Sequence, residues 1–279
     1  MSRLEAFAVE GAVDLTVRTP GGSVTVEAAD DVAEATVELE PRDDAARTAV
    51  EEAVVELRRS GTRAELFVSV EHGFRVGGRR GPRLTISVGK GPKLGVRIRV
   101  PSGSSLDVAT ESADVTATGS YDRADVRSAS GDVRLEAVEG EATLKSVSGD
   151  VSVERVAGKA SVNSVSGDAV IGTIGGPADV HSVSGDVEVR EAEASAKVKT
   201  ISGDVRISSA KEGSFEMQSV SGDLTLGLRS GSRLWVDARS TSGKTKSELD
   251  ISDAPASEDR PLVELRAKSV SGDITVVRA

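Results

Sequence analysis

The chain has 279 residues, no cysteine and a formal net charge of −10. This length can bury a sizeable core, and the absence of thiols excludes disulfides, a thiolate nucleophile and thiolate metal ligands. The negative charge argues against a nucleic-acid-binding protein, because phosphate contacts need clustered Lys and Arg. With four Phe, one Tyr and one Trp, a groove that stacks sugars or bases on aromatic rings is hard to build.

The N-terminal stretch MSRLEAFAVEGAVDLTV lacks both a basic start and an unbroken apolar run. It therefore predicts no signal peptide. No segment approaches the roughly 20 apolar residues that span a bilayer. We expect a cytoplasmic protein with no transmembrane segment.

Residues 1–101 are predicted to form an irregular β-rich region that contains one amphipathic helix. Asp43 and Asp44 stand where a first helical turn would lie, and Arg58 stands where a last turn would lie. Charges in these places complement the helix dipole. We predict a helix from about 42 to 59 that covers the end of the following repeats, where unpaired strand edges would otherwise invite aggregation.

The charge reverses between residues 72 and 106, where eight basic residues occur with no Asp or Glu. Glycine and proline place the tip of this segment in a turn that a partner could reach. Two interpretations stay open. The segment is either a hairpin with solvated charges or a contact for phosphate, an acidic lipid surface or the acidic flank of a second copy. The residues proposed for that contact are Arg75, Arg79, Arg80, Arg83, Lys90 and Lys93.

Residues 102–279 repeat themselves. Gly-Asp pairs recur every 18 residues from Asp132 to Asp204, and Asp223 follows after 19. Each unit contains a half-period of nine residues, in which apolar residues take positions one, three and six and glycine takes position eight. All nine half-units between Val133 and Gly213 carry Leu, Val or Ile at position three. The repeats are predicted to stack into one continuous body.

This spacing predicts strands, because apolar positions separated by two, three and four residues form no 3.6-residue stripe. Val, Ile, Ser and Thr are also enriched, as in strands. The break in alternation between positions three and six requires the chain to bend there. We therefore predict a mainly β fold, a parallel β-solenoid of about 18-residue repeats. The alternative is an antiparallel β-meander of nine-residue strands, in which each Gly-Asp is a two-residue hairpin loop.

The recurring SVSGD sequence is interpreted as a corner of the solenoid. Its glycine supplies a positive φ, and its aspartate accepts a hydrogen bond from nearby backbone amides and so closes the turn. The two serines are small enough to stack and hydrogen-bond along the stack. The predicted turn residues are Gly131, Asp132, Gly149, Asp150, Gly167, Asp168, Gly185, Asp186, Gly203, Asp204, Gly222, Asp223, Gly272 and Asp273.

A row of stacked aspartates also allows an ion-binding interpretation, although the denser G-G-x-G-x-D pattern of calcium repeats is missing. Two carboxylates at suitable distances would likewise suit glycoside hydrolysis. That chemistry needs two acids in different environments, however, and a periodic row makes them alike. His72 and His181 stand alone. We predict no catalytic residue, no metal ligand and no cofactor.

The stretch VRIRVPSGSSLDVATESADVTATG at 96–119 and the units that follow it, such as VRSASGDVRLEAVEGEATLKSVSGD, resemble the bacterial putative adhesin family of unknown function. Its modules are also called toast-rack domains. The resemblance covers about residues 96–279, and VRTPGGSVTVEA near the N-terminus looks like a further copy. It implies a β-helix-like stack without known enzymatic activity, often encoded with envelope-stress and membrane-associated components. The chain departs from the pattern at Ala113 and at Lys244.

We therefore expect a non-enzymatic scaffold or protein-interaction module. The alternative is an ion-binding or carboxylate-dependent protein that acts on a polysaccharide. The closing sequence SVSGDITVVRA has no following helix, so its strand is expected to leave an unpaired edge. We predict a homo-oligomer formed through this C-terminal edge, together with an unidentified protein partner, no nucleic acid and at most peripheral membrane contact.

Overall fold

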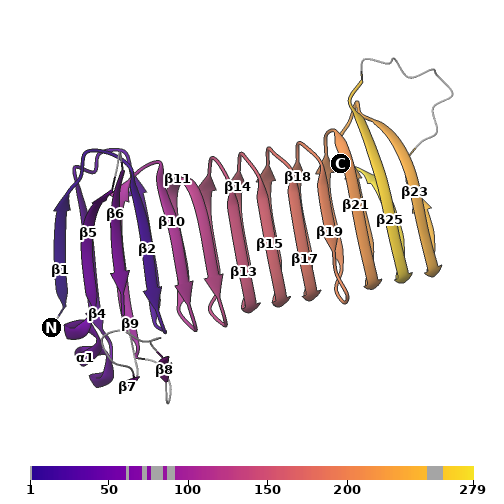
Figure 1. Ribbon diagram of the computed structural model, residues 1–279. Helices are drawn as coiled ribbons and strands as arrows, with labels where there is room; N and C mark the ends of the chain where they lie inside the picture. The colour runs from indigo at the N-terminus through magenta and orange to yellow at the C-terminus, as the bar shows by residue number, and fades with distance from the viewer. Residues whose placement is uncertain (1, 61–62, 71–73, 77–83, 87–91, 250–259) are drawn as a thin grey trace. The chain divides into compact units, whose positions relative to one another are not determined.

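The computed structural model describes residues 2–60, 63–70, 74–76, 84–86, 92–249 and 260–279. The fold is mainly β, with parallel strands that wind into a β-solenoid (Figure 1). The predicted fold class is thus confirmed, and the antiparallel meander is excluded for the repeats. The chain divides into two compact units, one of residues 1–121 and 125–133, the other of residues 122–124 and 134–279. No helix in the described part is long and apolar enough to cross a bilayer.

The first unit contains the only helix of the described chain. Its elements are β1 (Arg3–Ala8), β2 (Val13–Thr19), β3 (Ser23–Ala29), β4 (Glu34–Pro41), α1 (Asp44–Glu52), β5 (Val54–Ser60), β6 (Arg63–Ser69), β7 (Phe74–Val76), β8 (Leu84–Ile86), β9 (Leu94–Pro101), β10 (Ser104–Thr110) and most of β11 (Asp114–Ser128).

The second unit consists of strands and tight corners. Its elements are β12 (Val133–Val138), β13 (Ala142–Ser148), β14 (Val151–Val156), β15 (Ala160–Ser166), β16 (Ala169–Ile174), β17 (Ala178–Ser184), β18 (Val187–Ala192), β19 (Ala196–Lys199), β20 (Val205–Ala210), β21 (Gly213–Ser221), β22 (Leu224–Leu228), β23 (Arg233–Ser242), β24 (Thr245–Ser247), β25 (Leu262–Ser271) and β26 (Ile274–Arg278).

One 18-residue repeat makes one rung of the second unit, with two strands and two corners. Ala142 in β13 pairs with Ala160 in β15, and Ala160 pairs with Ala178 in β17, all in parallel. The other wall follows the same register, in which Val151 of β14 pairs with Ala169 of β16. Each side chain therefore lies above the equivalent side chain of the previous rung.

The core lies between the two walls of stacked strands. The residue at position three of each half-unit points inward. Leu144, Val162 and Ile171 are at most 1% exposed. Position one also points inward, as at Ala160 and Val187. The predicted inward positions are therefore confirmed. Their burial removes apolar surface from water at every rung, which stabilises the stack.

The first unit begins with antiparallel strands. β1 pairs with β4, β4 pairs antiparallel with β9, and β9 joins β3 in parallel. A second set starts with the antiparallel pair β5–β6, from which β6 joins β2 in parallel. The first unit thus changes from hairpin pairing to the parallel pairing of the solenoid.

The predicted helix is present but shorter than expected. The Asp43 side chain caps α1 by accepting a hydrogen bond from the Ala46 amide at 2.7 Å, and α1 packs on β4 through Ala46, Ala49 and Val50. The prediction was wrong beyond Glu52, because residues 54–60 form β5 and pair with β6. The β-sheet hydrogen bonds to β6 outweigh the helical pattern in this segment.

The order of rungs at the end of the second unit differs from the order in the sequence. β25 lies between β21 and β23, and β26 lies between β22 and β24. β26 was expected to be the unpaired edge, and that expectation was wrong, because it pairs on both sides. The last rung of the stack is formed by β23 and β24 instead.

Replacing Leu144 with Asp should unfold the second unit, since an unpaired charge in a dry core costs several kcal/mol, roughly the stability of a domain. Val147→Asp, three residues along the same strand but at an exposed position, is the matched control and should keep the fold. Circular dichroism during a thermal ramp measures both. A wild-type melting temperature for Leu144→Asp would contradict the inward assignment.

Candidate interaction surface

The SVSGD corners rest on close contact between successive glycines. Gly167, Gly185 and Gly203 have φ between 110° and 130°, a range that side chains with a Cβ disfavour. A Cβ on Gly167 would also lie 2.5 Å from the carbonyl oxygen of Gly149, one rung away. Glycine is therefore required both by the backbone conformation and by the spacing of the rungs.

The aspartates link one rung to the next. Oδ1 of Asp150 accepts a hydrogen bond from the Asp168 amide at 2.9 Å, and Asp168 accepts one from the Asp186 amide at 2.8 Å. The same contact continues through Asp204, Asp223 and Asp273 to the amide of Lys244. The predicted hydrogen bond from a nearby backbone amide to each carboxylate is present, but the amide belongs to the following rung, so the bond links rungs instead of closing a turn.

The two serines of each corner have different roles. The first serine is buried, and Oγ of Ser146 donates to the carbonyl of Gly149 at 3.1 Å within the same corner. The second serine, such as Ser148, is exposed. Serines of successive rungs do stack, as Ser146 does on Ser164, but the hydroxyl groups of these two serines donate within their own corners and not along the stack as predicted.

The apolar residue between the two serines faces solvent. Six such residues, here called the valine ladder, are 43–54% exposed: Val147, Val165, Val183, Ile201, Val220 and Val270. At the strand spacing of about 4.8 Å, six rungs make a stripe about 24 Å long. Large exposed apolar side chains in an unbroken row mark interaction sites more often than scattered ones do.

The corner itself does not require a valine. In the first unit, Ser128 and Gly131 make the same serine-to-carbonyl hydrogen bond at 2.8 Å, and the Asp132 amide donates to Asp114. Yet the residue at the valine position there is Ala129, and one corner earlier it is Glu111. The last rung of the second unit has Thr241 at this position. The apolar ladder is thus an added property of six rungs and not a condition for folding.

The pattern of apolar residues alone does not separate this ladder from the core. Position six of the half-unit is apolar throughout, but it is buried at Val156 and Ile174 and exposed at Val165 and Val183. A usable signal existed, because the exposed set always stands between small polar residues, serine or threonine before it and serine after it. The buried set has no such pair.

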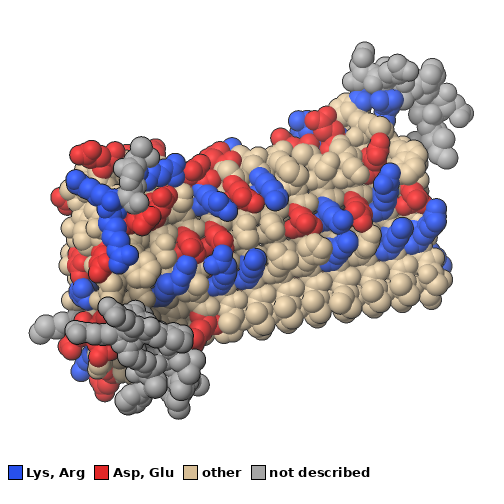
Figure 2. Space-filling view, in the orientation of Figure 1, with Lys and Arg blue, Asp and Glu red and all other residues tan. Residues whose placement is uncertain are grey.

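Charged rows border the valine ladder on both sides. The outward residue two positions before each ladder residue gives a row of six, Lys145, Asn163, His181, Lys199, Gln218 and Lys268, and Arg239 continues the row on the last rung, beside Thr241. It is called here the basic row. Three positions after each ladder residue comes an aspartate of the hydrogen-bonded series above. In Figure 2, an uncharged stripe runs along the edge of the second unit and Lys and Arg side chains lie beside it.

The predicted anion contact of the first unit lies largely outside the described residues. Arg79, Arg80, Arg83 and Lys90 are not described, and of Arg75 only the backbone in β7 is. Lys93 stands just before β9, where its amide donates to Asp43 at 3.1 Å. Farther along β9, Arg97 pairs with Glu38 and Glu40, and Arg99 pairs with Glu27 and Asp31. These two cations are therefore balanced within the unit.

A family model for Toastrack DUF4097 matches residues 10–175 and 173–277. The chain belongs to this family. The match includes the first unit, so it extends beyond the region from residue 96 onward that the sequence pattern indicated. No curated protein matches the sequence.

Solved structures share the toast-rack fold at low identity. A putative lipid binding protein from Parabacteroides distasonis has a TM-score of 0.58 at 13% identity, with 99% of this chain and 97% of that chain covered. A putative adhesin from the same species gives 0.51 at 13%, with the same coverage. A putative adhesin from Bacteroides fragilis gives 0.50 at 15%, again with 99% and 97% covered. At such identity the likeness concerns the fold alone.

Asp186→Ala should lower the free energy of unfolding of this toast-rack chain by about 1 kcal/mol, because the Asp204 amide loses a charge-assisted acceptor. Asp186→Asn keeps Oδ1 and removes like-charge repulsion, so it should remain within about 0.5 kcal/mol of wild type. Lys244→Ala, on the last rung, is the control and should have no effect. Urea unfolding measures all three; equal loss in the Asn and Ala variants would refute the acceptor role.

Calcium at millimolar concentration should raise the melting temperature by no more than about two degrees, because only a ligand that binds the native state stabilises it. The structural reason is that Oδ1 of each stacked aspartate already accepts a backbone amide. Differential scanning calorimetry with calcium or with a chelator tests this. A large rise that disappears in Asp150→Asn with Asp168→Asn would establish an ion ladder instead.

Proposed function

We propose that this chain is a non-enzymatic β-repeat scaffold that associates laterally with a second copy of itself through the valine ladder. The observation that carries the proposal is that six successive corners expose Val or Ile where Ala129, Glu111 and Thr241 serve equivalent corners. The apolar residues cost solubility and are not needed for the turn. Two of the similar structures are described as putative adhesins, which supports a binding role over a catalytic one.

A second copy fits the ladder better than other partners because it has the same spacing. An apolar residue recurs at every rung, so each contact on one copy has an equivalent contact on the other across a two-fold axis. An anionic membrane would gain from the basic row but would be repelled by the parallel row of aspartates. A copy of the same surface can satisfy both rows together.

The charged rows select a parallel arrangement. If the two-fold axis runs along the stacking direction, the basic row of one copy faces the aspartate row of the other. If one copy runs in the opposite direction, basic row faces basic row and aspartate row faces aspartate row, and like charges across an interface are costly. Within the basic row, His181 contacts Asp179 and Arg239 pairs with Asp237. Lys145, Lys199 and Lys268 form no ion pair with a described carboxylate, so they are available to a second copy.

The expected affinity is modest. Full burial of a valine side chain contributes about 1.5–3 kcal/mol, so completing the burial of a half-exposed one contributes about 1 kcal/mol. Twelve ladder residues in two copies therefore give on the order of 10 kcal/mol, against an association cost of about 4–15 kcal/mol. We expect a dimer at tens of micromolar protein, with the charged rows fixing its direction.

Replacing Val165, Val183 and Ile201 with Ser should convert the dimer into a monomer. At protein concentrations too low for dimers to form, the variant should keep the wild-type melting temperature, because the corner tolerates small residues. Val170→Ser, outside the ladder and half-buried on the other wall, is the matched control. Sedimentation velocity at several protein concentrations measures the dimer fraction. A wild-type protein that stays near 28.8 kDa at high concentration would refute self-association, and a capture by another protein would then become the alternative.

The parallel direction can be tested separately with single cysteines, since the chain has none of its own. A parallel two-fold dimer places Val147 opposite Val147 and Val270 opposite Val270. Val147→Cys and Val270→Cys should therefore each form a disulfide-linked dimer alone, and mixing them should add no mixed species, because a disulfide needs Cα atoms within about 7 Å. A mixed 147–270 dimer would establish the antiparallel arrangement and refute the role of the charged rows.

A further inference from the structure

A second feature of the chain, independent of the valine ladder, lies at the end of the second unit. The last rung leaves a cavity of about 680 Å³, which falls in the size range of small-molecule sites. Nothing in the described chain stacks on β23, so its side chains stay open to solvent. Trp235 is 47% exposed and Leu262 of the neighbouring β25 is 39% exposed.

An arginine stands where the earlier rungs place an apolar residue. Buried apolar residues at equivalent positions of successive rungs form one column of the core. They are Val156, Ile174, Ala192, Ala210 and Leu228. The next residue of this column, in register with Leu228, is Arg278. Arg278 is exposed, so its guanidinium is open to solvent and to an anionic ligand. The column of apolar side chains is thus followed by a charged side chain at the end of the stack.

The cavity carries more positive charge than its own acids balance. Arg260, Arg266 and Arg278 line it and form no ion pair with a described carboxylate, and Glu264 is the one acidic residue among the described lining residues. The Arg266 guanidinium lies 5.8 Å from the centre of the Trp235 ring. In a chain of net charge −10, such a local excess of arginine favours an anionic ligand.

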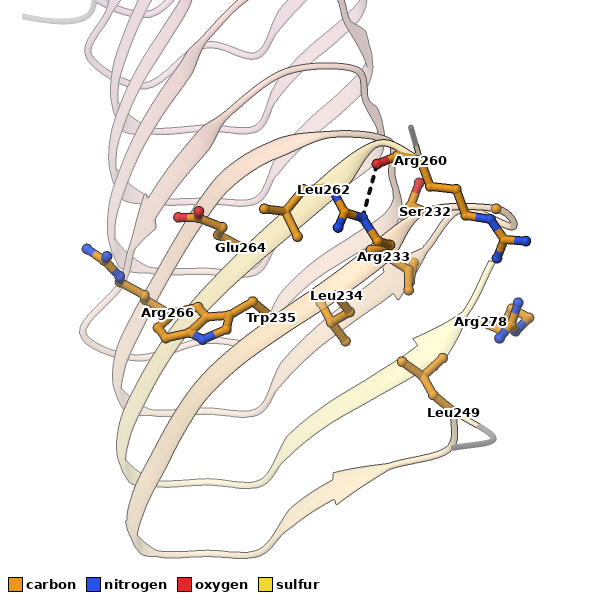
Figure 3. A pocket seen from close by; sticks show the side chains of 12 residues that line it. Ser232, Arg233, Leu234, Trp235, Leu249, Arg260, Leu262, Glu264, Arg266 and Arg278 are labelled. Carbon is orange, nitrogen blue, oxygen red and sulfur yellow. Dashed lines mark hydrogen bonds between the residues drawn. The ribbon is translucent and has the colours of Figure 1, made fainter. Parts of the chain in front are cut away.

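Figure 3 shows how the charged and apolar side chains are divided. Arg260 and Arg278 lie on one side, Trp235 and Arg266 lie on the other, and Leu234 stands between them. Leu249 and Leu262 add further apolar surface to the lining. The site therefore offers two neighbouring surfaces, one for an acidic group and one for an apolar chain.

We infer that this cavity binds an anionic amphiphile, with its phosphate or carboxylate against Arg260 and Arg278 and its apolar chain along Leu234, Leu262 and the Trp235 ring. Arginine forms bidentate hydrogen bonds to both kinds of acidic group. An apolar chain would cover side chains that the missing next rung leaves open. Both parts of the ligand are needed for full affinity.

Trp235 is the only tryptophan of the chain, so its fluorescence reports the cavity directly. Titration with monododecyl phosphate below its micelle concentration should shift the emission to shorter wavelength and saturate. Arg260→Gln with Arg278→Gln should weaken binding at least tenfold, and Arg206→Gln, on the outer face of β20, is the matched control with no effect. Circular dichroism confirms that the double variant is folded.

Two further probes separate the parts of the ligand. Inorganic phosphate alone and dodecyltrimethylammonium should each bind at least tenfold more weakly than dodecyl phosphate. Equal binding of phosphate would reduce the site to an anion site and overturn the amphiphile assignment, and equal binding of the cation would overturn the role of the arginines. The serine variant of the valine ladder should bind dodecyl phosphate like wild type, so failure of self-association does not affect this test.

The segment 250–259 joins Leu249 to Arg260 and carries four carboxylates in its sequence. A variant with Asp250, Asp253 and Asp259 changed to Asn and Glu258 to Gln controls for competition by these acids. It should bind dodecyl phosphate at least as tightly as wild type. Loss of binding in this variant would overturn the assignment of the site to the arginine-lined cavity.

Discussion

Successive rungs of this solenoid lie so close that their glycines leave no space for a Cβ. A Cβ on Gly185 or Gly203 would lie 2.3 Å or 2.2 Å from the carbonyl oxygen one rung before, so only glycine fits where the corners stack. Once this register is set, every position of the 18-residue unit becomes a column of equivalent residues. The parallel hydrogen bonds and the aspartate-to-amide contacts then repeat without further information.

Because equivalent residues stack in a column, a property of one residue is repeated at every rung. A buried leucine becomes a continuous core, and one aspartate becomes a row of carboxylates that must be compensated. The amide hydrogen bonds to Asp168 and Asp186 supply part of that compensation. The same repetition converts a single exposed valine, which needs no explanation on its own, into a continuous exposed apolar stripe.

Much of the fold could be predicted from the sequence because the repeat unit and the rung are the same length. The spacing of the Gly-Asp pairs predicts the length of one rung, and the invariant apolar residue at position three predicts which side chains point into the core. The exposed position six could not be recognised by hydrophobicity alone, since Val165 and Val156 are the same residue in opposite environments. What separates them is the pair of serines, whose small side chains let the backbone bend so that the residue between them points outward.

The end of the stack could not be predicted either, because strand order follows pairing and not sequence. The long intervals between Asp223, Lys244 and Asp273 marked the place where the order changes but gave no means to assign β23 to the outside. The cavity depends on this exchange. Trp235 and Leu262 are exposed because β23, and not the C-terminal strand, is the last to pair.

The last rung also differs chemically from the rungs beneath it. The Lys244 amide donates to Asp273 like the aspartate amides before it, but an ammonium cannot accept the amide of a further rung. Thr241 ends the apolar ladder, and β24 has only three residues. Short, charged edges oppose the addition of further strands. Addition of a further strand is thus opposed at β24, whereas the ten-residue β23 remains the longer open edge of the described stack.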